Sequence, residues 1–241
     1  MSVWGKIIGG AAGFAMGGPL GALLGGIAGH AFDKMRVAQT EDGGTKQVAF
    51  TIGVIVLGAK MAKADGVVTR DEIEAFREVF HVPPDEVKNV ARVFDLAKRD
   101  SRGFEPYAEQ LAGMFRGNPA VLEDLLDGLF HIAKADSVYH SAENEFLARV
   151  AAIFGFSEAD FNRIRAGHVG SDDSDPYIIL GLDREASDDE LKSRYRTLIR
   201  EHHPDTLIAQ GVPQEFVDVA NEKLAVINDA YDRVAKERGL T

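Results

Sequence analysis

Cysteine is absent from this sequence of 241 residues. Disulfide bonds, thiolate zinc sites, iron–sulfur clusters and cysteine nucleophiles are therefore excluded, and a reducing compartment is compatible with the composition. Positive charge is also scarce, because 27 lysines and arginines face 38 aspartates and glutamates and leave a net charge of −11. This balance argues against a general phosphate-binding surface, so we expect no nucleic-acid partner, while a local basic patch is compatible with it.

Strand-like alternation of apolar and polar residues is missing from the middle of the chain, and so are the usual catalytic signatures. That region has no serine–histidine–aspartate order, no phosphate-binding Walker loop and no zinc-protease motif. With 45% hydrophobic and 27% charged residues, the chain still has enough apolar side chains to form a core. We therefore expect an all-α protein that is not an enzyme and uses no cofactor.

Charge is missing altogether from the 26 residues between Lys6 and Asp33. That length exceeds the roughly 20 residues that a helix needs to cross a bilayer. In lipid, small residues on one helix face let two helices pack closely, whereas in water each glycine costs a helix about 1 kcal/mol relative to alanine. We therefore predict that residues 1–36 are a membrane anchor with a self-association face for a homodimer. Glycine occupies every fourth position of that face, at Gly9, Gly13, Gly17, Gly21, Gly25 and Gly29.

Three other interpretations of this segment stay open, and one of them is a secretory signal peptide with a cleavage site at the Ala-Gly-His-Ala of residues 28–31. A flexible glycine- and alanine-rich tail on a soluble cytoplasmic protein has the same composition, and so does a pair of short helices broken near Gly18 and Pro19. The flanking charges do not fix an orientation, because Lys6 on one side and Lys34 and Arg36 on the other differ too little for the positive-inside rule.

Residues 37–44 are a polar linker, and residues 45–168 are patterned as an all-helical domain. The apolar run from Val48 to Ala59 suits a buried core helix and is too short to span a membrane. Proline and glycine breaks separate the helices that follow. These helices are expected at residues 69–80, 84–100, 104–116, 119–135, 141–154 and 157–167.

This middle region contains an internal duplication. Ala-Lys-Ala-Asp-Gly at residues 62–66 returns as Ala-Lys-Ala-Asp-Ser at residues 133–137, 71 positions later, and at the same offset Glu72 matches Glu143. Each copy has the pattern of a helix, a tight turn and a second helix. Two related helical hairpins predict a pseudo-symmetric bundle.

The duplicated pattern resembles the TerB-like domain of tellurite-resistance proteins over residues 45–168. In that family the acidic loop residues have been proposed as a metal site, so the resemblance implies Asp65, Glu72, Asp136 and Glu143 as candidate ligands. A hard cation such as Ca²⁺ takes six or more oxygen ligands, and the spacing of an EF-hand is missing. Turn formation by aspartate and helix capping by glutamate explain the same residues without a metal.

A second polar linker at residues 169–174 precedes a small C-terminal domain at residues 175–241. Residues 175–182 predict a short helix and a glycine turn, and Ser187 with Glu190 forms a capping box before a helix that reaches about Glu201. The apolar face of this helix holds Leu191, Tyr195, Leu198 and Ile199. Its basic residues are Lys192, Arg194, Arg196 and Arg200.

The tripeptide His203-Pro204-Asp205 ends that helix, because proline cannot continue it. A loop through Gly211 is expected next, and then a last helix from Pro213 to about Lys236. Two antiparallel helices with matching apolar faces, clasped by the short first helix, make a helical hairpin domain. The core positions expected along the last helix are Phe216, Ala220, Leu224, Ile227 and Tyr231.

This C-terminal domain resembles the J-domain of DnaJ-type co-chaperones. The resemblance is carried by Asp-Pro-Tyr-Ile-Ile-Leu-Gly-Leu at 175–182, Tyr195-Arg196, His203-Pro204-Asp205 and Ile-Asn-Asp-Ala-Tyr at 227–231. It implies a DnaK-type ATPase chaperone as partner. It also implies a chaperone-binding site made of His203, Pro204, Asp205, Tyr195 and the four basic residues of the preceding helix.

The order of the three regions is similar to that of membrane-anchored DnaJ-like co-chaperones. The resemblance implies an N-terminus that crosses the bacterial inner membrane once and a J-domain that faces the cytoplasm. The implied function is stimulation of ATP hydrolysis by the DnaK-type chaperone. The alternative is a membrane-associated interaction or stress-sensing module in which the TerB-like bundle binds a partner or a metal.

Overall fold

The computed structural model describes residues 17–25, 43–65, 82–84, 86–100, 103–134, 141–168 and 174–240. Every regular element in these ranges is a helix, which confirms the all-α prediction. The middle bundle consists of α4 (Gly43–Asp65), α6 (Val87–Arg99), α7 (Glu105–Met114), α8 (Pro119–Ala133), α9 (Ser141–Phe154) and α10 (Glu158–His168). The C-terminal domain consists of α11 (Pro176–Leu180), α12 (Asp188–Glu201), α13 (Pro204–Gln210), η1 (Gln214–Phe216) and α14 (Val217–Glu237).

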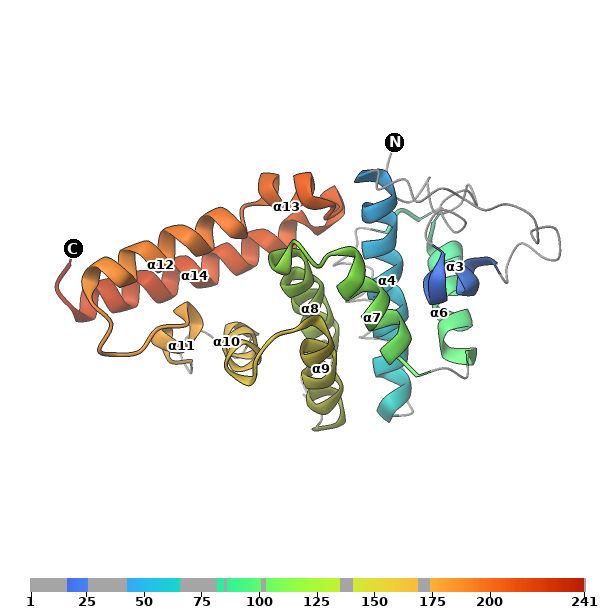
Figure 1. Ribbon diagram of the computed structural model, residues 1–241, viewed down its shortest axis with the longest axis horizontal. Helices are drawn as coiled ribbons and strands as arrows, with labels where there is room; N and C mark the ends of the chain where they lie inside the picture. The colour runs from blue at the N-terminus through green and yellow to red at the C-terminus, as the bar shows by residue number, and fades with distance from the viewer. Residues whose placement is uncertain are drawn as a thin grey trace.

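The C-terminal domain projects from one side of the middle bundle (Figure 1). Helices α12 and α14 run alongside each other as a long hairpin, and the chain's C-terminus lies at its far end. The near end of the hairpin, with α13, contacts α8 of the bundle. The two regions therefore meet at the end of the hairpin where α12 leads into α13.

Helix α4 is the centre of the middle bundle and contacts α6, α7, α8 and α9. Its apolar side chains from Val48 to Ala59 are buried, as predicted for a core helix. In the described part of the chain, Gly44–Ala62 is the one helical stretch long and apolar enough to cross a membrane by length and composition. Because this stretch is mostly buried among the other helices, it acts here as the core of the bundle.

The other bundle helices lie close to their expected positions. Helices α6 to α10 correspond to the predictions for residues 84–100, 104–116, 119–135, 141–154 and 157–167, with ends that differ by a few residues. Helices α7 and α8 each carry proline in the first turn, where its missing N–H needs no partner. The helix expected at residues 69–80 lies outside the described residues.

Helix α3 (Gly18–Gly25) is the described part of the glycine-rich segment, and it packs on the bundle. Leu20 and Leu23 are buried there. The Gln110 side chain of α7 accepts a hydrogen bond from the Leu20 N–H at 2.9 Å and donates one to the Gly17 carbonyl at 3.0 Å. This short helix is thus attached to the bundle by both apolar and polar contacts.

The backbone at Gly17 and Gly18 interrupts the helix that the glycine spacing predicts. Their φ angles of 54° and 59° are left-handed, a conformation that favours glycine, so α3 begins at Gly18. The start of α3 lies next to the position near Gly18 and Pro19 that the alternative of two short helices names, and the residues before Gly17 lie outside the described ranges. Gly21 and Gly25 are in α3, whereas Gly9, Gly13 and Gly29 lie outside the described residues. The role of these glycines in self-association stays a prediction.

The first two helices of the C-terminal domain form as predicted. The Asp175 side chain caps α11 by accepting a hydrogen bond from the Tyr177 N–H, and Gly181 ends that helix with a φ of 67°. Both hydrogen bonds of the capping box between Ser187 and Glu190 are present at the start of α12. Local side-chain chemistry therefore fixes where each of these helices begins.

The segment after α12 is a helix, so the loop expected after His203-Pro204-Asp205 and through Gly211 is wrong. Proline ends α12, but it also starts α13, because the first position of a helix tolerates its missing N–H and its fixed φ. The helix ends at Gly211, whose φ is 109°, and the Gly211 and Val212 N–H groups bond to the Ile208 and Leu207 carbonyls.

The apolar positions of the last helix belong to two different cores. Ile227 packs within the hairpin, with Leu224 and Tyr231 at the edge of that core. Phe216 and Ala220 instead belong to the core of the middle bundle, so their predicted place in the hairpin core is wrong. The Phe216 ring meets the Phe50 ring of α4 edge-on, with centroids 4.7 Å apart. The start of α14 is thus buried against the bundle.

Candidate functional site

The HPD turn, His203-Pro204-Asp205, forms the start of helix α13. His203 is the N-cap, and its Nδ1 accepts a hydrogen bond from the Asp205 N–H at 3.2 Å. This bond leaves Nε2 to carry the proton of the neutral imidazole. The His203 side chain is 50% exposed and the Asp205 side chain 90% exposed. The turn therefore presents an N–H donor and a carboxylate to solvent from a hydrogen-bonded helix start.

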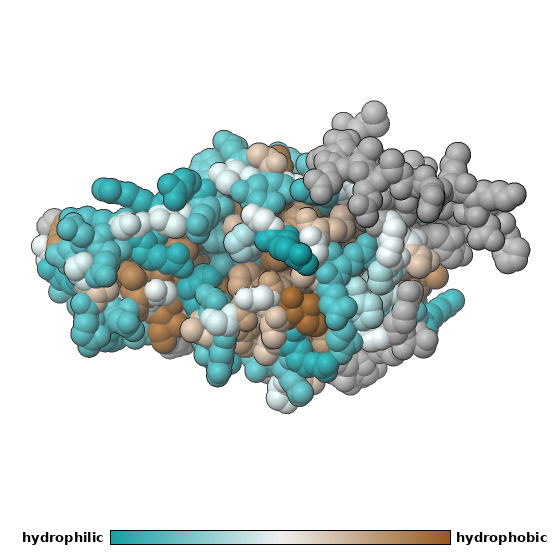
Figure 2. Space-filling view, viewed as in Figure 1, coloured by the Kyte–Doolittle hydropathy of each residue, from teal (hydrophilic) through white to brown (hydrophobic). Residues whose placement is uncertain are grey.

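Three basic residues of α12 lie on one face of that helix. Lys192, Arg196 and Arg200 are spaced four residues apart, which turns each by only about 40° from the last. Arg196 and Arg200 line a shallow depression of about 310 Å³ together with His203. Its other lining residues are Tyr195, Ile199 and Thr206. The surface around α12 is largely hydrophilic in the view of Figure 2.

Arg194, the fourth basic residue, lies on another side of α12. It stands two positions from Lys192 and from Arg196, which is more than half a turn away. Its Nε donates a hydrogen bond to the Leu180 carbonyl of α11 at 3.0 Å. Burial, and then the neighbouring Arg163, lower the pKa of the Arg194 guanidinium. In this structure Arg194 joins α12 to α11 and does not line the depression.

Tyr195 holds the hairpin together from the edge of the depression. Its hydroxyl donates a hydrogen bond to Asn228 Oδ1 on α14 at 2.9 Å. Its ring stacks on the Tyr231 ring, with centroids 4.1 Å apart and planes 21° apart. The structure therefore brings together most of the predicted chaperone-binding residues and gives Tyr195 a packing contact as well.

The four acidic residues implied as metal ligands are only partly described. Asp65 is the last residue of α4, and Glu143 is buried in the first turn of α9. Glu72 and Asp136 lie outside the described residues. Within the described ranges, no group of three or more potential ligand side chains is placed to hold a metal ion. The metal site stays a prediction.

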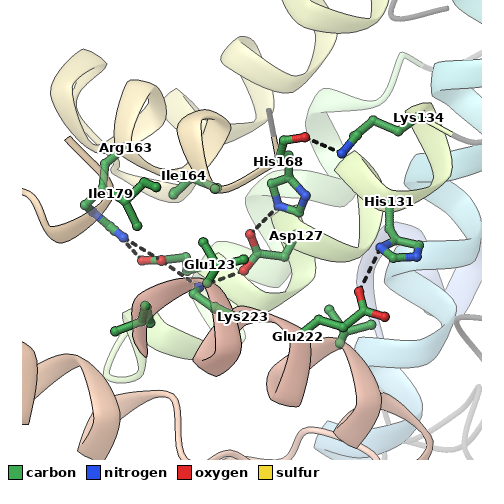
Figure 3. Close-up of a pocket in the computed structure, with 14 residues that line it drawn as sticks. Glu123, Asp127, His131, Lys134, Arg163, Ile164, His168, Ile179, Glu222 and Lys223 are labelled. Atoms are coloured by element: carbon green, nitrogen blue, oxygen red, sulfur yellow. Dashed lines mark hydrogen bonds and ion pairs between the residues drawn. The ribbon is translucent and has the colours of Figure 1, made fainter. Parts of the chain in front are cut away.

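A buried group of charged and titratable side chains, here named the ion cluster, joins the middle bundle to the C-terminal domain, and Figure 3 labels its members except Asp124 and His202. Its members are Glu123, Asp124 and Asp127 of α8, Arg163 and His168 of α10, His202 at the end of α12, and Lys223 of α14. The Lys223 side chain is only 12% exposed. Its Nζ lies 2.6 Å from Glu123 Oε1 and 2.6 Å from Asp127 Oδ2. Lys223 therefore bridges the two carboxylates from the other side of the junction.

The remaining members lie against the same three carboxylates of α8, although Asp124 Oδ1 and His202 Nδ1 have no hydrogen-bond partner among the described residues. Arg163 donates two hydrogen bonds to Glu123, at 2.8 Å and 2.5 Å. His168 Nε2 lies 2.7 Å from Asp127 Oδ1. His202 lies between the other two carboxylates, with Nε2 3.6 Å from Glu123 Oε1 and Nδ1 3.5 Å from Asp124 Oδ1. His202, the residue directly before the HPD turn, is thus buried against α8.

Burial and pairing act in opposite directions on the pKa values of these groups. Burial opposes the ionisation of Glu123, but Lys223 and Arg163 outweigh it and hold the pKa of Glu123 well below 4.5. Burial is likewise outweighed at Asp127, whose pKa Lys223 and His168 lower. Burial prevails at Asp124 and raises its pKa. The carboxylates raise the pKa of Lys223 above its ordinary 10.5 despite burial.

Acid is expected to destabilise this junction. The lowered pKa values of Glu123 and Asp127 mean that each stabilises the fold above its ordinary value of 4.5 or 3.8 and loses that effect as the pH falls through the folded-state pKa. Lys223 has a raised pKa, so its stabilising effect is fully present below pH 10.5 and is lost only at higher pH. Lys223 therefore does not cause the loss of stability in acid. Thermal unfolding of wild type and Glu123→Gln should show a Tm difference at about pH 7 that shrinks toward about pH 3. A difference that stays constant with pH would contradict the pairing.

The ion cluster was not predicted from the sequence, although α8 carries a signal for it. Glu123, Asp124 and Asp127 interrupt an otherwise apolar helix. Charges inside a buried helix require partners, so such a pattern indicates that cationic side chains pack against it. The sequence near α8 does not identify these cations, because one of them, Lys223, lies 96 residues after Asp127 in the chain.

Comparison with known proteins gives three family models that match the chain in order. The transmembrane domain of co-chaperone DjlA matches residues 1–49, the tellurite resistance protein TerB residues 51–166, and the DnaJ domain residues 175–238. A relative from Photobacterium profundum, co-chaperone protein DjlA, is 30% identical over 98% of this chain and 99% of its own length. The chain belongs to the DjlA family of co-chaperones. A relative of the same name from Vibrio cholerae is 31% identical over the full length of both chains.

Membership in the DjlA family confirms the resemblance drawn from the sequence. The C-terminal domain is a J-domain, the middle bundle is TerB-like, and the protein is a J-domain co-chaperone. The match to a DjlA transmembrane domain supports membrane anchoring by the N-terminal segment. The domain boundaries given above stay predictions. No solved structure matches the chain.

Proposed function

We propose that this J-domain co-chaperone stimulates ATP hydrolysis by a DnaK-type chaperone at the cytoplasmic face of the bacterial inner membrane. The observation that carries the proposal is the exposed depression in which His203 lies beside Arg196 and Arg200. The chaperone supplies the nucleotide site and the hydrolysis chemistry. The J-domain acts as a regulator and not as an enzyme, because it contributes no group to the attack of water on ATP.

The basic face and the HPD turn have separate tasks in this proposal. Lys192, Arg196 and Arg200 attract an acidic chaperone surface and speed its approach. Asp205 then accepts hydrogen bonds from a basic group of the chaperone, and the Nε2–H of His203 donates one. Helix α13 holds both groups in place before binding, which lowers the ordering cost of the contact.

Stimulation follows when the co-chaperone binds one state of its partner more tightly than the other. An effector shifts a conformational equilibrium only through such a difference in affinity. We infer that the face formed by α12 and α13 binds the hydrolysis-competent state of the chaperone preferentially. Pro204 contributes by fixing the backbone at the first position of α13, between the two contacting side chains.

Membrane attachment places this activity at the lipid surface. The match of residues 1–49 to the DjlA transmembrane domain supports membrane anchoring. In this proposal the N-terminal segment spans the membrane once and the J-domain lies on the cytoplasmic side, where a DnaK-type chaperone and ATP are available. The spaced glycines support a homodimer formed by close packing of two such segments.

Single-turnover ATP hydrolysis by the DnaK-type chaperone of the same organism tests the proposed activity. Adding the purified protein should raise the hydrolysis rate of a preformed chaperone–ATP complex. An unchanged rate with a correctly folded protein would refute the proposal.

The double variant Arg196→Glu, Arg200→Glu should slow association with the chaperone by one to two orders of magnitude at low salt, because charge attraction becomes repulsion. Added salt should reduce the wild-type rate, since exposed charges farther apart than the Debye length, about 8 Å at physiological ionic strength, are largely screened. Stopped-flow mixing measures both effects. Lys88→Glu with Arg92→Glu is a matched control, because these exposed residues of α6 have the same spacing. A salt-independent wild-type rate would show that the basic face is not the docking face.

A further inference from the structure

The end of the J-domain that carries the HPD turn is built into the core of the TerB-like bundle. Leu207 of α13, Val212 and Phe216 are all buried there and not in the hairpin core. A Cβ atom at position 128 of α8 would come within 2.9 Å of the Phe216 ring, so Gly128 leaves the space that the ring occupies. These three side chains form an apolar plug from the J-domain into the bundle.

The ion cluster attaches the same end of the J-domain at a second place. Lys223 lies on α14 shortly after the plug and bridges Glu123 and Asp127. His202, which is 2% exposed, faces Glu123 and Asp124. Both contacts are made to α8, the helix that also carries Gly128. One bundle helix therefore receives both the charges and the phenylalanine ring.

The HPD turn is held on both sides by these contacts. His202 precedes the turn and Leu207 follows Asp205 by two residues, and both are buried against the bundle. Between them, His203 and Asp205 are exposed. A J-domain joined only by the linker at residues 169–174 would tumble separately, whereas a shared core fixes the direction of α13 relative to the bundle.

We propose that the TerB-like bundle is the positioning element of the HPD turn, and that the apolar plug and the ion cluster clamp α13 in the orientation that the chaperone binds. Lys223 and Phe216 are positioning residues in this account, because they act through α13 and do not contact the partner. The effect on the chaperone rests on the proposed function above. The clamp itself is a property of this chain alone and is measurable without the chaperone.

Lys223→Met in the full-length protein tests the clamp. Methionine keeps the apolar stem but leaves Glu123 and Asp127 without their shared cation. Hydrogen exchange of the Leu207, Gly211 and Val212 amides, which are hydrogen-bonded in and after α13, should become at least about tenfold faster. The Leu191 amide at the start of α12 should keep its rate, because it lies in the hairpin core.

The same variant should raise the protein concentration needed for half-maximal stimulation of ATP hydrolysis by about tenfold, while the rate at saturation stays near that of wild type. A loosened α13 reaches the binding orientation less often, but His203 and Asp205 are intact. Lys223→Arg should restore both readouts, since it keeps the charge. Lys236→Met, at an exposed position near the end of α14, is the matched control and should change neither.

Phe216→Leu is a second variant, which keeps an apolar side chain in the bundle core and leaves the ion cluster intact. It should also speed hydrogen exchange of the α13 amides. If exchange in α13 is unchanged in both variants, the clamp is refuted whatever the chaperone does. If exchange accelerates but the dose dependence of stimulation does not move, the bundle does not serve the HPD turn. If wild type itself gives no stimulation, the proposed function fails, while the exchange data still decide the clamp.

Discussion

His203→Gln is expected to abolish stimulation of the DnaK-type ATPase while helix content and thermal unfolding stay nearly unchanged. The His203 side chain is half exposed, so its replacement removes a contact group and leaves the core intact. Losing an N-cap hydrogen bond costs about 1 kcal/mol, which is small beside the stability of a domain. Single-turnover hydrolysis and circular dichroism measure the two halves of this prediction.

The expected size of this effect follows from what glutamine lacks. Imidazole fixes Nδ1 as the acceptor for the Asp205 N–H and Nε2 as an outward donor, whereas a glutamine side chain is longer and rotates freely. Ala209→Gln is the matched control, because it puts the same side chain on an exposed position of α13 away from the turn. Full stimulation by His203→Gln would refute the proposed mechanism. Loss of stimulation by the control would show that α13 tolerates no change at all.

Deleting residues 1–33 is expected to move the protein completely from the membrane fraction to the soluble fraction. The deletion removes the uncharged segment and α3, whereas α4, the other long apolar stretch, stays buried in the bundle. The soluble fragment should retain full stimulation, because the bundle and the J-domain remain. Carbonate extraction followed by single-turnover hydrolysis checks both. A fragment that stays in the membrane would show that the anchor extends into α4.

Replacing Gly9, Gly13 and Gly29 by leucine, which leaves the left-handed Gly17 and the packed helix α3 unchanged, separates anchoring from self-association. Leucine inserts into lipid at least as readily as glycine, so the variant should remain in the membrane fraction. Its bulk should prevent close approach of two segments, so crosslinking of the dimer should be lost. A variant that crosslinks as well as wild type would show that the spaced glycines are not the interface. Wild type found in the soluble fraction would contradict the anchor itself.

Local signals in the sequence were sufficient to predict the position of most helices of the fold. Helical periodicity located α6 to α10, and the capping box of Ser187 and Glu190 located the start of α12. Such features act over one or two helical turns, so the helix positions that they specify do not depend on the rest of the chain. The J-domain and the family were identified for the same reason, because the tripeptide at 203–205 and its flanking helices are patterns in linear order.

Helix α13 shows how one local rule outweighed another. Proline after α12 favoured a loop, yet proline is also well suited to the first position of a helix, and Gly211 supplies the end. The sequence contained both signals. Seven residues are too few for periodicity to decide between them.

The sequence by itself determined most of the helices with the exception of α13, the caps of α11 and α12, the exposed tripeptide and the membership in the DjlA family. Only the tertiary structure decided that Phe216 packs with Phe50 instead of in the hairpin, that Arg194 turns toward Leu180, and that Lys223 joins α8. The apolar or charged pattern of a helix is the same in the sequence whichever neighbouring helix its side chains pack against. The partner of each side chain depends on which helices pack together, and for Lys223 and Asp127 that contact spans 96 residues of chain.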